Sequence, residues 1–254
     1  MISSLMNPRF PVIIAYIACF TIITILIYSE AISQEYGTCI AMIARKGTVM
    51  IGADSRVMGP GRKISGEDTF CKIIQLDRRV FFAMSGMYSF RKIFNAKEIA
   101  RYSWNPKRTT RENIREFERI CQLRIKRSIE AGLARNGVRP QCIFVDMGAV
   151  NPTMYRRRFN LTVSPTDTDI TRGDLSLNKA FTDIFGACAD PIDSKKDMHY
   201  RFLRGPTWKD AILGFIENAK ERLPSVGGDI DILYLTKSDA VWIQKKKNCP
   251  DIWK

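Results

Sequence analysis

Residues 37–54 read Gly37-Thr38-Cys39-Ile40-Ala41-Met42-Ile43-Ala44-Arg45-Lys46-Gly47-Thr48-Val49-Met50-Ile51-Gly52-Ala53-Asp54 and predict the first pair of strands in the domain. Two apolar runs flank Arg45-Lys46-Gly47, where the glycine can take the left-handed backbone conformation that tight hairpin turns need. If the turn centres on Lys46, Thr38 lies opposite Asp54. A hydroxyl and a carboxylate then share one edge of a sheet.

A second pair of strands is predicted further along the chain. Residues 72–76 and 80–84 are largely apolar, and Asp77-Arg78-Arg79 between them is typical of a turn. Pairing of the two runs places Lys72 near Ser85-Gly86. We therefore expect an ammonium group and the backbone N–H of a glycine to lie at the same end of a sheet.

Thr38, Asp54, Lys72 and Gly86 together supply the groups of an acyl-transfer site. A lysine close to an aspartate and to a threonine hydroxyl stabilises the conjugate base of the hydroxyl, and glycine leaves its N–H open to an incoming carbonyl. We expect Thr38 to be the nucleophile, Asp54 to pair with Lys72, and Gly86 to line the oxyanion hole. The alternatives are a buried structural ion pair, and a Gly37-Thr38 loop that merely enters a strand.

The order and spacing of these residues resemble the opening of a proteasome β-type subunit. The resemblance rests on Gly37-Thr38, Asp54-Ser55-Arg56, Lys72-Ile73-Ile74 and Met84-Ser85-Gly86, and it continues more weakly to Gly227-Gly228. It implies an α+β fold for residues 38–254, namely the four-layer αββα sandwich of N-terminal nucleophile hydrolases. It also implies that the free amine of Thr38 accepts the proton of the attacking hydroxyl, and that the protein forms a homo-oligomer.

The supporting residues depart from the pattern of active family members. Ala187 stands where they carry a serine, and Leu223-Pro224-Ser225-Val226 lacks the expected aspartate. Because these groups normally hydrogen-bond the terminal amine, their loss puts the activity in doubt, and Ser225 is the candidate replacement for a lost hydroxyl. In the family, the residues that line the substrate pocket correspond to Val57, Phe70, Met84 and Tyr88. They imply a preference for apolar substrate side chains, and plain core packing is the alternative.

Helices are predicted between the strands. One is expected over Met87–Trp104, and a second follows a capping box at Thr109-Thr110-Arg111-Glu112 because apolar residues recur at helical spacing up to Ile129. A third is expected over Thr207–Arg222, with Thr207 as its cap. The family resemblance also implies a strand pair at Cys142–Val145 and Tyr155–Leu161 and a turn at Gly186-Ala187-Cys188.

The first residues differ in kind from the rest of the chain. Arg9 precedes the apolar run Val12–Tyr28, and Ser29-Glu30-Ala31 offers the small residues that a signal peptidase recognises. Residues 1–31 are therefore predicted to be a signal peptide, with an uncleaved membrane anchor as the alternative because the run is long enough to span a bilayer. Both predict an exported protein: secreted, periplasmic or membrane-anchored. Residues 32–37 would be a short propeptide, removed to free the Thr38 amine.

Cysteine usage agrees with export, because an even number of cysteines remains without Cys19. Cys39 follows the nucleophile and Cys71 precedes the lysine, so a Cys39–Cys71 disulfide is predicted, with ordinary buried thiols as the alternative. Cys39 as the nucleophile is a further alternative, which would shift the hairpin register away from Asp54. His199 is the single histidine and no CxxC pair occurs, so no metal and no other cofactor is expected.

The formal net charge of +14 favours an anionic partner. The basic runs Arg156-Arg157-Arg158, Lys195-Lys196 and Lys245-Lys246-Lys247 are candidates for contact with an anionic membrane surface or an acidic substrate, or are simply solvated. No nucleic-acid partner is expected, since no binding motif accompanies the charge. Two functions remain. One is an exported threonine peptidase or amidase acting on peptides or small amides, and the other is a catalytically silent, membrane-anchored domain for assembly or binding.

Overall fold

The structure is a computed structural model that describes residues 34–37, 39–58, 70–90, 94–130, 140–161, 168–180, 182–188, 194–247 and 249–253. These residues belong to one compact unit, Gln34–Lys254. The predicted signal peptide or anchor, residues 1–31, and the predicted nucleophile Thr38 lie outside the described residues. Among the described helices, none combines the length and the apolar character that a membrane span requires.

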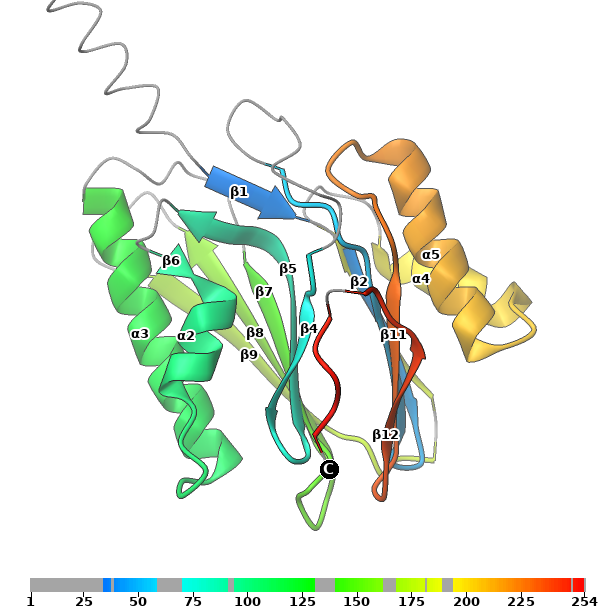
Figure 1. The fold of residues 1–254 in the computed structure, drawn as a ribbon, viewed down its shortest axis with the longest axis horizontal. Coiled ribbons are helices and arrows are strands. Elements are labelled where there is room, and N and C mark those ends of the chain that lie inside the picture. Colours follow the sequence, from blue (N-terminus) through cyan, green and yellow to red (C-terminus); the bar gives the residue numbers. More distant parts are fainter. Residues whose placement is uncertain are drawn as a thin grey trace, which may run out of the picture. The chain divides into compact units, whose positions relative to one another are not determined.

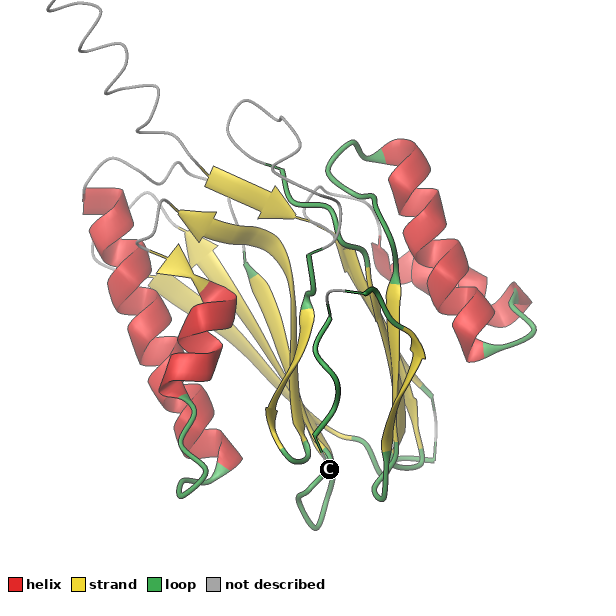
Figure 2. Ribbon diagram, in the orientation of Figure 1, coloured by secondary structure: helices red, strands yellow, loops and turns green. Residues whose placement is uncertain are grey.

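The described residues form two antiparallel sheets and four helices, so the predicted α+β fold class is confirmed (Figure 2). In the seven-stranded sheet the order is β1 (Gln34–Gly37), β5 (Val80–Phe90), β7 (Gln141–Asp146), β8 (Thr153–Leu161) and β9 (Thr168–Ser176). Two short strands, β4 (Ile73–Asp77) and β6 (Phe94–Asn95), also pair with β5. In the five-stranded sheet the order is β10 (Asp183–Cys188), β2 (Cys39–Arg45), β3 (Thr48–Ala53), β11 (Asp231–Leu235) and β12 (Ala240–Gln244).

Helices cover the outer face of each sheet (Figure 1). The seven-stranded sheet packs against α2 (Ala96–Ser103) and α3 (Thr110–Glu130) through an apolar cluster. The five-stranded sheet packs against α4 (Ser194–Arg204) and α5 (Trp208–Arg222) through another, and a third cluster lies between the sheets. Side chains alternate along each strand, which lets one sheet contribute to two clusters. In β2, Met42 faces the other sheet while Ile43 faces the helices.

Two of the predicted helices form with the predicted caps. Glu112 N donates to Thr109 Oγ1 at 3.3 Å and Thr109 N donates to Glu112 Oε2 at 2.8 Å, so the capping box before α3 is present. Thr207 caps α5 by accepting from Asp210 N at 3.2 Å. At Gly52 a side chain would overlap Ile212 of α5, so this glycine allows the helix to approach the sheet.

Other elements differ from the prediction. The helix predicted over Met87–Trp104 is wrong in its first part, because residues 87–90 continue β5 and pair with β1 and β6. The helix α2 begins only after Asn95, whose side chain accepts from Glu98 N at 3.0 Å. The turn predicted at Gly186-Ala187-Cys188 is also wrong, since these residues end β10 and pair with β2. The predicted strand pair is confirmed as β7 and β8.

The first hairpin forms with a register one residue away from the predicted one. Lys46 (φ 49°) and Gly47 (φ 73°) both adopt the left-handed conformation, which closes the hairpin with a two-residue turn. Arg45 therefore pairs with Thr48. The backbone N–H of Asp54 donates to the carbonyl of Cys39 at 3.3 Å, so Cys39 occupies the place opposite Asp54 that was predicted for Thr38. The prediction assumed a turn centred on Lys46 alone.

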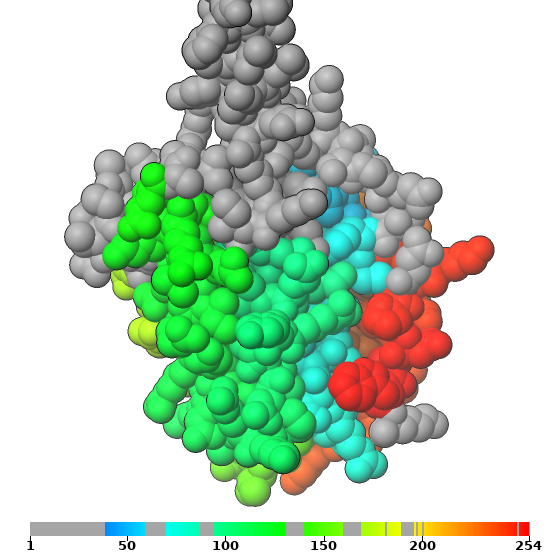
Figure 3. Space-filling view, turned by 60° about the vertical axis from the view of Figure 1, so that its left-hand side comes forward, coloured from blue at the N-terminus to red at the C-terminus, as the bar shows by residue number. Residues whose placement is uncertain are grey.

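The end of the chain returns to the seven-stranded sheet. After β12, residues 249–253 run back toward β4, where Trp253 N donates to Gln75 Oε1 at 2.8 Å. Gln75 Nε2 donates in turn to Trp253 O at 2.9 Å. In the space-filling view these red residues lie against the cyan residues of the β4 region (Figure 3). The C-terminal segment thus links the two sheets.

Candidate functional site

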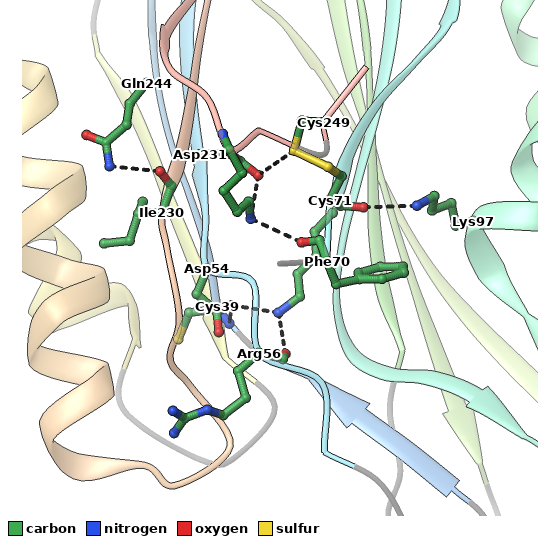
Figure 4. A network of polar contacts seen from close by, with 12 residues as sticks. Cys39, Asp54, Arg56, Phe70, Cys71, Lys97, Ile230, Asp231, Gln244 and Cys249 are labelled. Carbon is green, nitrogen blue, oxygen red and sulfur yellow. Dashed lines mark hydrogen bonds and ion pairs between the residues drawn. A yellow bond between two sulfur atoms is a disulfide. The ribbon is translucent and has the colours of Figure 1, made fainter. Parts of the chain in front are cut away.

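A buried ion pair between Asp54 and Lys72 forms the centre of the candidate site (Figure 4). Asp54 follows β3 directly and Lys72 directly precedes β4. Lys72 Nζ lies 2.9 Å from Asp54 Oδ1 and donates to the carbonyl of Arg56 at 2.6 Å. The side chain of Lys72 is only 3% exposed and that of Asp54 is 0% exposed. The predicted pairing of Asp54 with Lys72 is therefore confirmed, and it joins the two sheets.

The Asp54 carboxylate also binds two backbone N–H groups. Its Oδ1 accepts from Cys39 N and its Oδ2 from Gly227 N, each at 2.9 Å. Gly227 O accepts in turn from Ser55 N at 3.1 Å and from Arg56 N at 2.9 Å. Asp54 thus fixes the start of β2 relative to Gly227 and Lys72.

Ser225 lies in the turn between α5 and β11, two residues before Gly227, which binds the same carboxylate. Arg56 Nη1 donates to the carbonyl of Pro224 at 3.2 Å and to that of Val226 at 3.3 Å, which holds the turn against the residues after Asp54. Ser225 itself is buried. Its role toward the Thr38 amine stays a prediction, because Thr38 lies outside the described residues. Ala187 is buried in the cluster between the sheets and offers no hydroxyl there.

Gly86 lies within β5 and has a φ of 85°, a conformation that favours glycine. Here β1 runs antiparallel to β5, and Gly37 pairs with Gly86 while Tyr36 pairs with Met87. Most of the predicted propeptide is thus a strand of the sheet in the intact chain. The residue before Thr38 lies beside the glycine predicted to line the oxyanion hole, an arrangement that the sequence did not reveal.

The four predicted pocket residues lie on three segments. Val57 and Met84 are buried, and Met84 belongs to the cluster beneath α2 and α3. Phe70 is half-buried just before Lys72, and the backbone of Tyr88 lies in β5. Ile73 pairs with Ala83, which places Lys72 level with Met84, one residue from the predicted position near Ser85. The apolar substrate preference stays a prediction.

A second buried ion pair, between Asp231 and Lys246, was missed by the sequence reasoning. Lys246 Nζ lies 2.5 Å from Asp231 Oδ2 and donates to the carbonyl of Phe70 at 3.1 Å. The backbone N–H of Lys246 donates to Asp231 Oδ1 at 2.9 Å. Burial raises the pKa of Asp231 and lowers the pKa of Lys246, since loss of water disfavours both charges more than their mutual attraction favours them.

Two of the predicted basic patches contain a buried central residue. Lys246 is one of them, because its ammonium group turns inward to Asp231. Arg157 is the other, because its guanidinium binds Glu118 of α3 and Asp174 of β9. Neither residue is available to a membrane surface in this structure. Alternation along β8 turns the Arg157 side chain toward the core, whereas Lys246 lies just after β12.

The predicted Cys39–Cys71 disulfide is wrong. Cys39 is bonded to Cys188, and Cys71 is bonded to Cys249. Cys39 faces the helices α4 and α5, and the pairing of β10 with β2 places Cys188 directly opposite it. Cys71 belongs to the other sheet, to which the C-terminal segment returns with Cys249. The Cys39 sulfur is therefore not a free nucleophile, although the register does place this residue opposite Asp54.

The remaining cysteines of the described residues are Cys121 and Cys142, which are free thiols in the cluster beneath α2 and α3. Burial raises the pKa of each thiol well above its usual value. Cys71, Asp231 and Cys249 bring sulfur and carboxylate atoms within 4.8 Å of one another, a spacing that could suit a metal ion. In this structure the two sulfurs bond each other and the carboxylate binds Lys246, so these atoms are already engaged.

Lys97, on α2, contacts the same segment from the helical side. Its Nζ donates to the carbonyl of Cys71 at 3.2 Å and lies 4.1 Å from the centroid of the Phe70 ring. Burial, and then the nearby charge of Arg101, lowers the pKa of Lys97 from 10.5 to about 8. Phe70 and Cys71 are thus held by lysines from two different elements.

Raising the pH from about 7 to about 10 is expected to stabilise the wild type relative to Lys97→Met by on the order of 1–3 kcal/mol. The folded-state pKa of Lys97 lies below its usual value, so the unfolded chain binds this proton more tightly. The resulting penalty is fully present below the folded-state pKa and disappears as the pH rises through the unfolded-state value. Urea unfolding of both proteins across this range measures the difference, and a constant difference contradicts the lowered pKa.

A scan of protein-family models and a search of curated proteins found no match to this chain. The geometry of the described residues is therefore the basis for assigning a function. A cavity of about 270 Å³ lies between β9 and β10, partly lined by Arg156, Leu175 and Phe185. Its lining includes none of the predicted catalytic or pocket residues, although Arg156 belongs to one of the predicted basic runs.

Proposed function

We propose that this protein is an exported threonine peptidase or amidase that processes itself at Gly37-Thr38 and cleaves peptide or small amide bonds. The observation that carries the proposal is the shared carboxylate of Asp54. Its Oδ1 binds both the Lys72 ammonium and the N–H of Cys39, the residue bonded to Thr38. The proposed nucleophile is thus the sequence neighbour of a residue that is anchored to a carboxylate, and the same carboxylate holds a buried lysine. A cation close to a hydroxyl favours its activation.

In the proposed self-processing step, Thr38 Oγ attacks the carbonyl carbon of Gly37. The attack forms the C–O bond and a tetrahedral intermediate, and the hydroxyl proton passes to the Gly37–Thr38 nitrogen. Collapse of the intermediate breaks the C–N bond, which leaves an ester and the free Thr38 amine. Water then hydrolyses the ester and releases the Gly37 carboxylate. The Lys72 charge stabilises the developing alkoxide, and the Gly86 N–H stabilises the oxyanion of the tetrahedral intermediate.

Turnover of a substrate repeats these events with the freed amine as the base. The amine takes the Thr38 hydroxyl proton through water and gives it to the departing amine of the substrate. Water then hydrolyses the ester on Thr38, so each cycle consumes one water molecule and regenerates the hydroxyl. No metal or other cofactor enters this scheme.

The pairing of β1 with β5 supports the self-processing step. It sets Gly37 beside Gly86, whose positive φ interrupts the regular strand at the position where the oxyanion would form. The neighbouring Ser85 Oγ is buried and has no hydrogen-bond partner among the described residues. A buried hydroxyl with unused bonding capacity is costly, and a polar group of the reacting peptide would satisfy it.

The fold and the disulfides agree with the wider proposal. Two sheets between two layers of helices suit the αββα sandwich of N-terminal nucleophile hydrolases, and we infer that fold and its tendency to self-associate. Two disulfides are typical of proteins in oxidising compartments, which supports export. The high positive charge would favour an anionic membrane surface or an acidic substrate. We do not propose a nucleic-acid partner.

Self-processing is tested by N-terminal sequencing and intact mass of the exported protein. We expect the wild type and Thr38→Ser to begin at residue 38, because both keep a hydroxyl. Thr38→Ala should retain residues 32–37 or the whole leader, since no oxygen is present to attack Gly37. If the wild type and Thr38→Ala begin at the same residue upstream of Thr38, the proposed hydrolase is wrong.

The second candidate is a catalytically silent domain that assembles or binds a partner. Ala187 favours it, because the apolar cluster between the sheets surrounds this side chain where an active family member would offer a hydroxyl. In that case the Asp54–Lys72 pair would serve only to hold the sheets together. The sequencing experiment separates the two candidates, since the silent domain keeps the peptide bond before Thr38.

A further inference from the structure

We propose that Asp231 and Lys246 are positioning residues for Lys72. Their ion pair holds the backbone of Phe70, two residues before Lys72, so that the Lys72 ammonium stays on Asp54. This inference deepens the proposed function and rests on it only for the chemical role of Lys72. The position of Lys72 can be tested whether or not the protein is a hydrolase.

The segment Phe70–Lys72 leads into β4 and is held at every residue (Figure 4). The carbonyl of Phe70 accepts from Lys246, which follows β12. Cys71 is held twice, by Lys97 at its carbonyl and by Cys249 at its sulfur. Lys72 reaches Asp54 after β3. Contacts at consecutive residues therefore fix both the path of the segment and the direction of the Lys72 side chain.

The strand register couples the two ion pairs. Asp231 of β11 pairs with Ala53 of β3, and Asp54 is the next residue after Ala53. Two adjacent carboxylates of the five-stranded sheet thus receive two lysines, one from the C-terminal segment and one from the segment before β4. A displacement of Phe70 would be passed to Lys72 through a single intervening residue, Cys71.

Burying the charges of Asp231 and Lys246 costs free energy, because both lose their hydration. This cost indicates that the pair does more than fill space, namely that it orients the Phe70 carbonyl. Buried pairs can often be replaced by apolar residues of similar volume with no loss of stability, because each charge gives up its hydration. Asp231 and Lys246 are 0% and 3% exposed. An apolar pair could fill the same space, but only a donor such as the Lys246 ammonium can fix the Phe70 carbonyl. Gln244 Nε2 supports the pair by donating to the carbonyl of Ile230 at 2.9 Å, which binds the end of β12 to the residue before Asp231.

The test compares Lys246→Met with the double variant Asp231→Asn/Lys246→Met in the full chain. The single variant leaves a buried unpaired carboxylate and should be less stable, whereas the double variant removes both charges and should recover most of the thermal midpoint. The probe of position is the proton–nitrogen NMR signal of the Lys72 ammonium, which is visible only when the group is held and shielded from water. We expect it to broaden or vanish in both variants, with self-processing slowed about tenfold or more.

A control for stability alone is Glu118→Gln/Arg157→Met, which removes a buried pair on the helical side of the seven-stranded sheet. It should leave the Lys72 signal unchanged. If Asp231→Asn/Lys246→Met regains both the thermal midpoint and the Lys72 signal, the pair is only structural and the positioning role is overturned. If the wild type does not process itself, the proposed hydrolase fails, and the Lys72 signal still decides the positioning role.

Discussion

Replacing Asp54 with alanine is expected to lower the free energy of unfolding by about 3–5 kcal/mol and to abolish self-processing. The substitution leaves the Lys72 ammonium buried without its counter-charge, which is the most costly way to disturb an ion pair. It also removes the acceptor of two backbone N–H groups, from Cys39 and Gly227. The start of β2 and the loop after α5 then lose a common anchor.

Urea unfolding at neutral pH measures this loss, and intact mass reports the processing. Asp54→Ala/Lys72→Met should recover part of the stability, since no buried charge remains, but none of the processing. A matched control is Asp210→Ala at the exposed start of α5, where a helix-terminal carboxylate contributes only about 0.3–1 kcal/mol. A loss at Asp54 as small as that of the control would show that the carboxylate is not the anchor.

Local signals in the sequence predicted the elements that depend on local interactions. The helices α3 and α5 have their caps at Thr109 and Thr207, and their apolar residues recur at helical spacing. Hydrogen bonds between residues three apart fix both starts, so neighbouring residues are sufficient to recognise them. The pairing of β7 with β8 is also confirmed, although it was implied by the family resemblance and not by a local signal.

Elements that depend on distant partners were mispredicted. Met87–Phe90 is a strand only because β1, about fifty residues upstream in the chain, and β6 pair with it. The predicted register of the first hairpin was wrong for a different reason. Lys46 adopts a positive φ, which lysine takes less readily than glycine or asparagine, so the two-residue turn had no clear signature in the sequence.

The candidate site was predicted in part, for a related reason. Spacing within each hairpin placed Asp54 and Lys72 next to strand ends, and the family resemblance supported their pairing, which joins two different sheets. Asp231 and Lys246 reach the site from the far end of the chain, and only the order of the strands shows that β11 lies beside β3. The predicted disulfide pairing was wrong for a similar reason. Cys39 faces the helices and bonds Cys188, while Cys71 bonds Cys249 of the returning C-terminal segment.

Removing either disulfide is expected to lower the free energy of unfolding by about 2–5 kcal/mol. The bonds join cysteines 149 and 178 residues apart, so both restrict the unfolded chain to nearly the same extent. Cys39→Ser/Cys188→Ser and Cys71→Ser/Cys249→Ser are therefore matched variants, and urea unfolding should give similar losses. A large difference between them would mean that contacts in the folded state, and not the restriction of the unfolded chain, dominate.

The two variants should differ in which part of the folded protein they loosen. Cys39 and Cys188 lie opposite each other on strands that the ladder of backbone hydrogen bonds already joins. Cys249 instead belongs to the C-terminal segment, which reaches the other sheet through Lys246 and through the pair of hydrogen bonds between Trp253 and Gln75. We expect hydrogen exchange at the backbone amides of residues 249 and 253 to accelerate in Cys71→Ser/Cys249→Ser but not in Cys39→Ser/Cys188→Ser. If these amides stay as protected as in the wild type, Lys246 and Gln75 suffice to hold the segment, and the disulfide acts on the unfolded chain only.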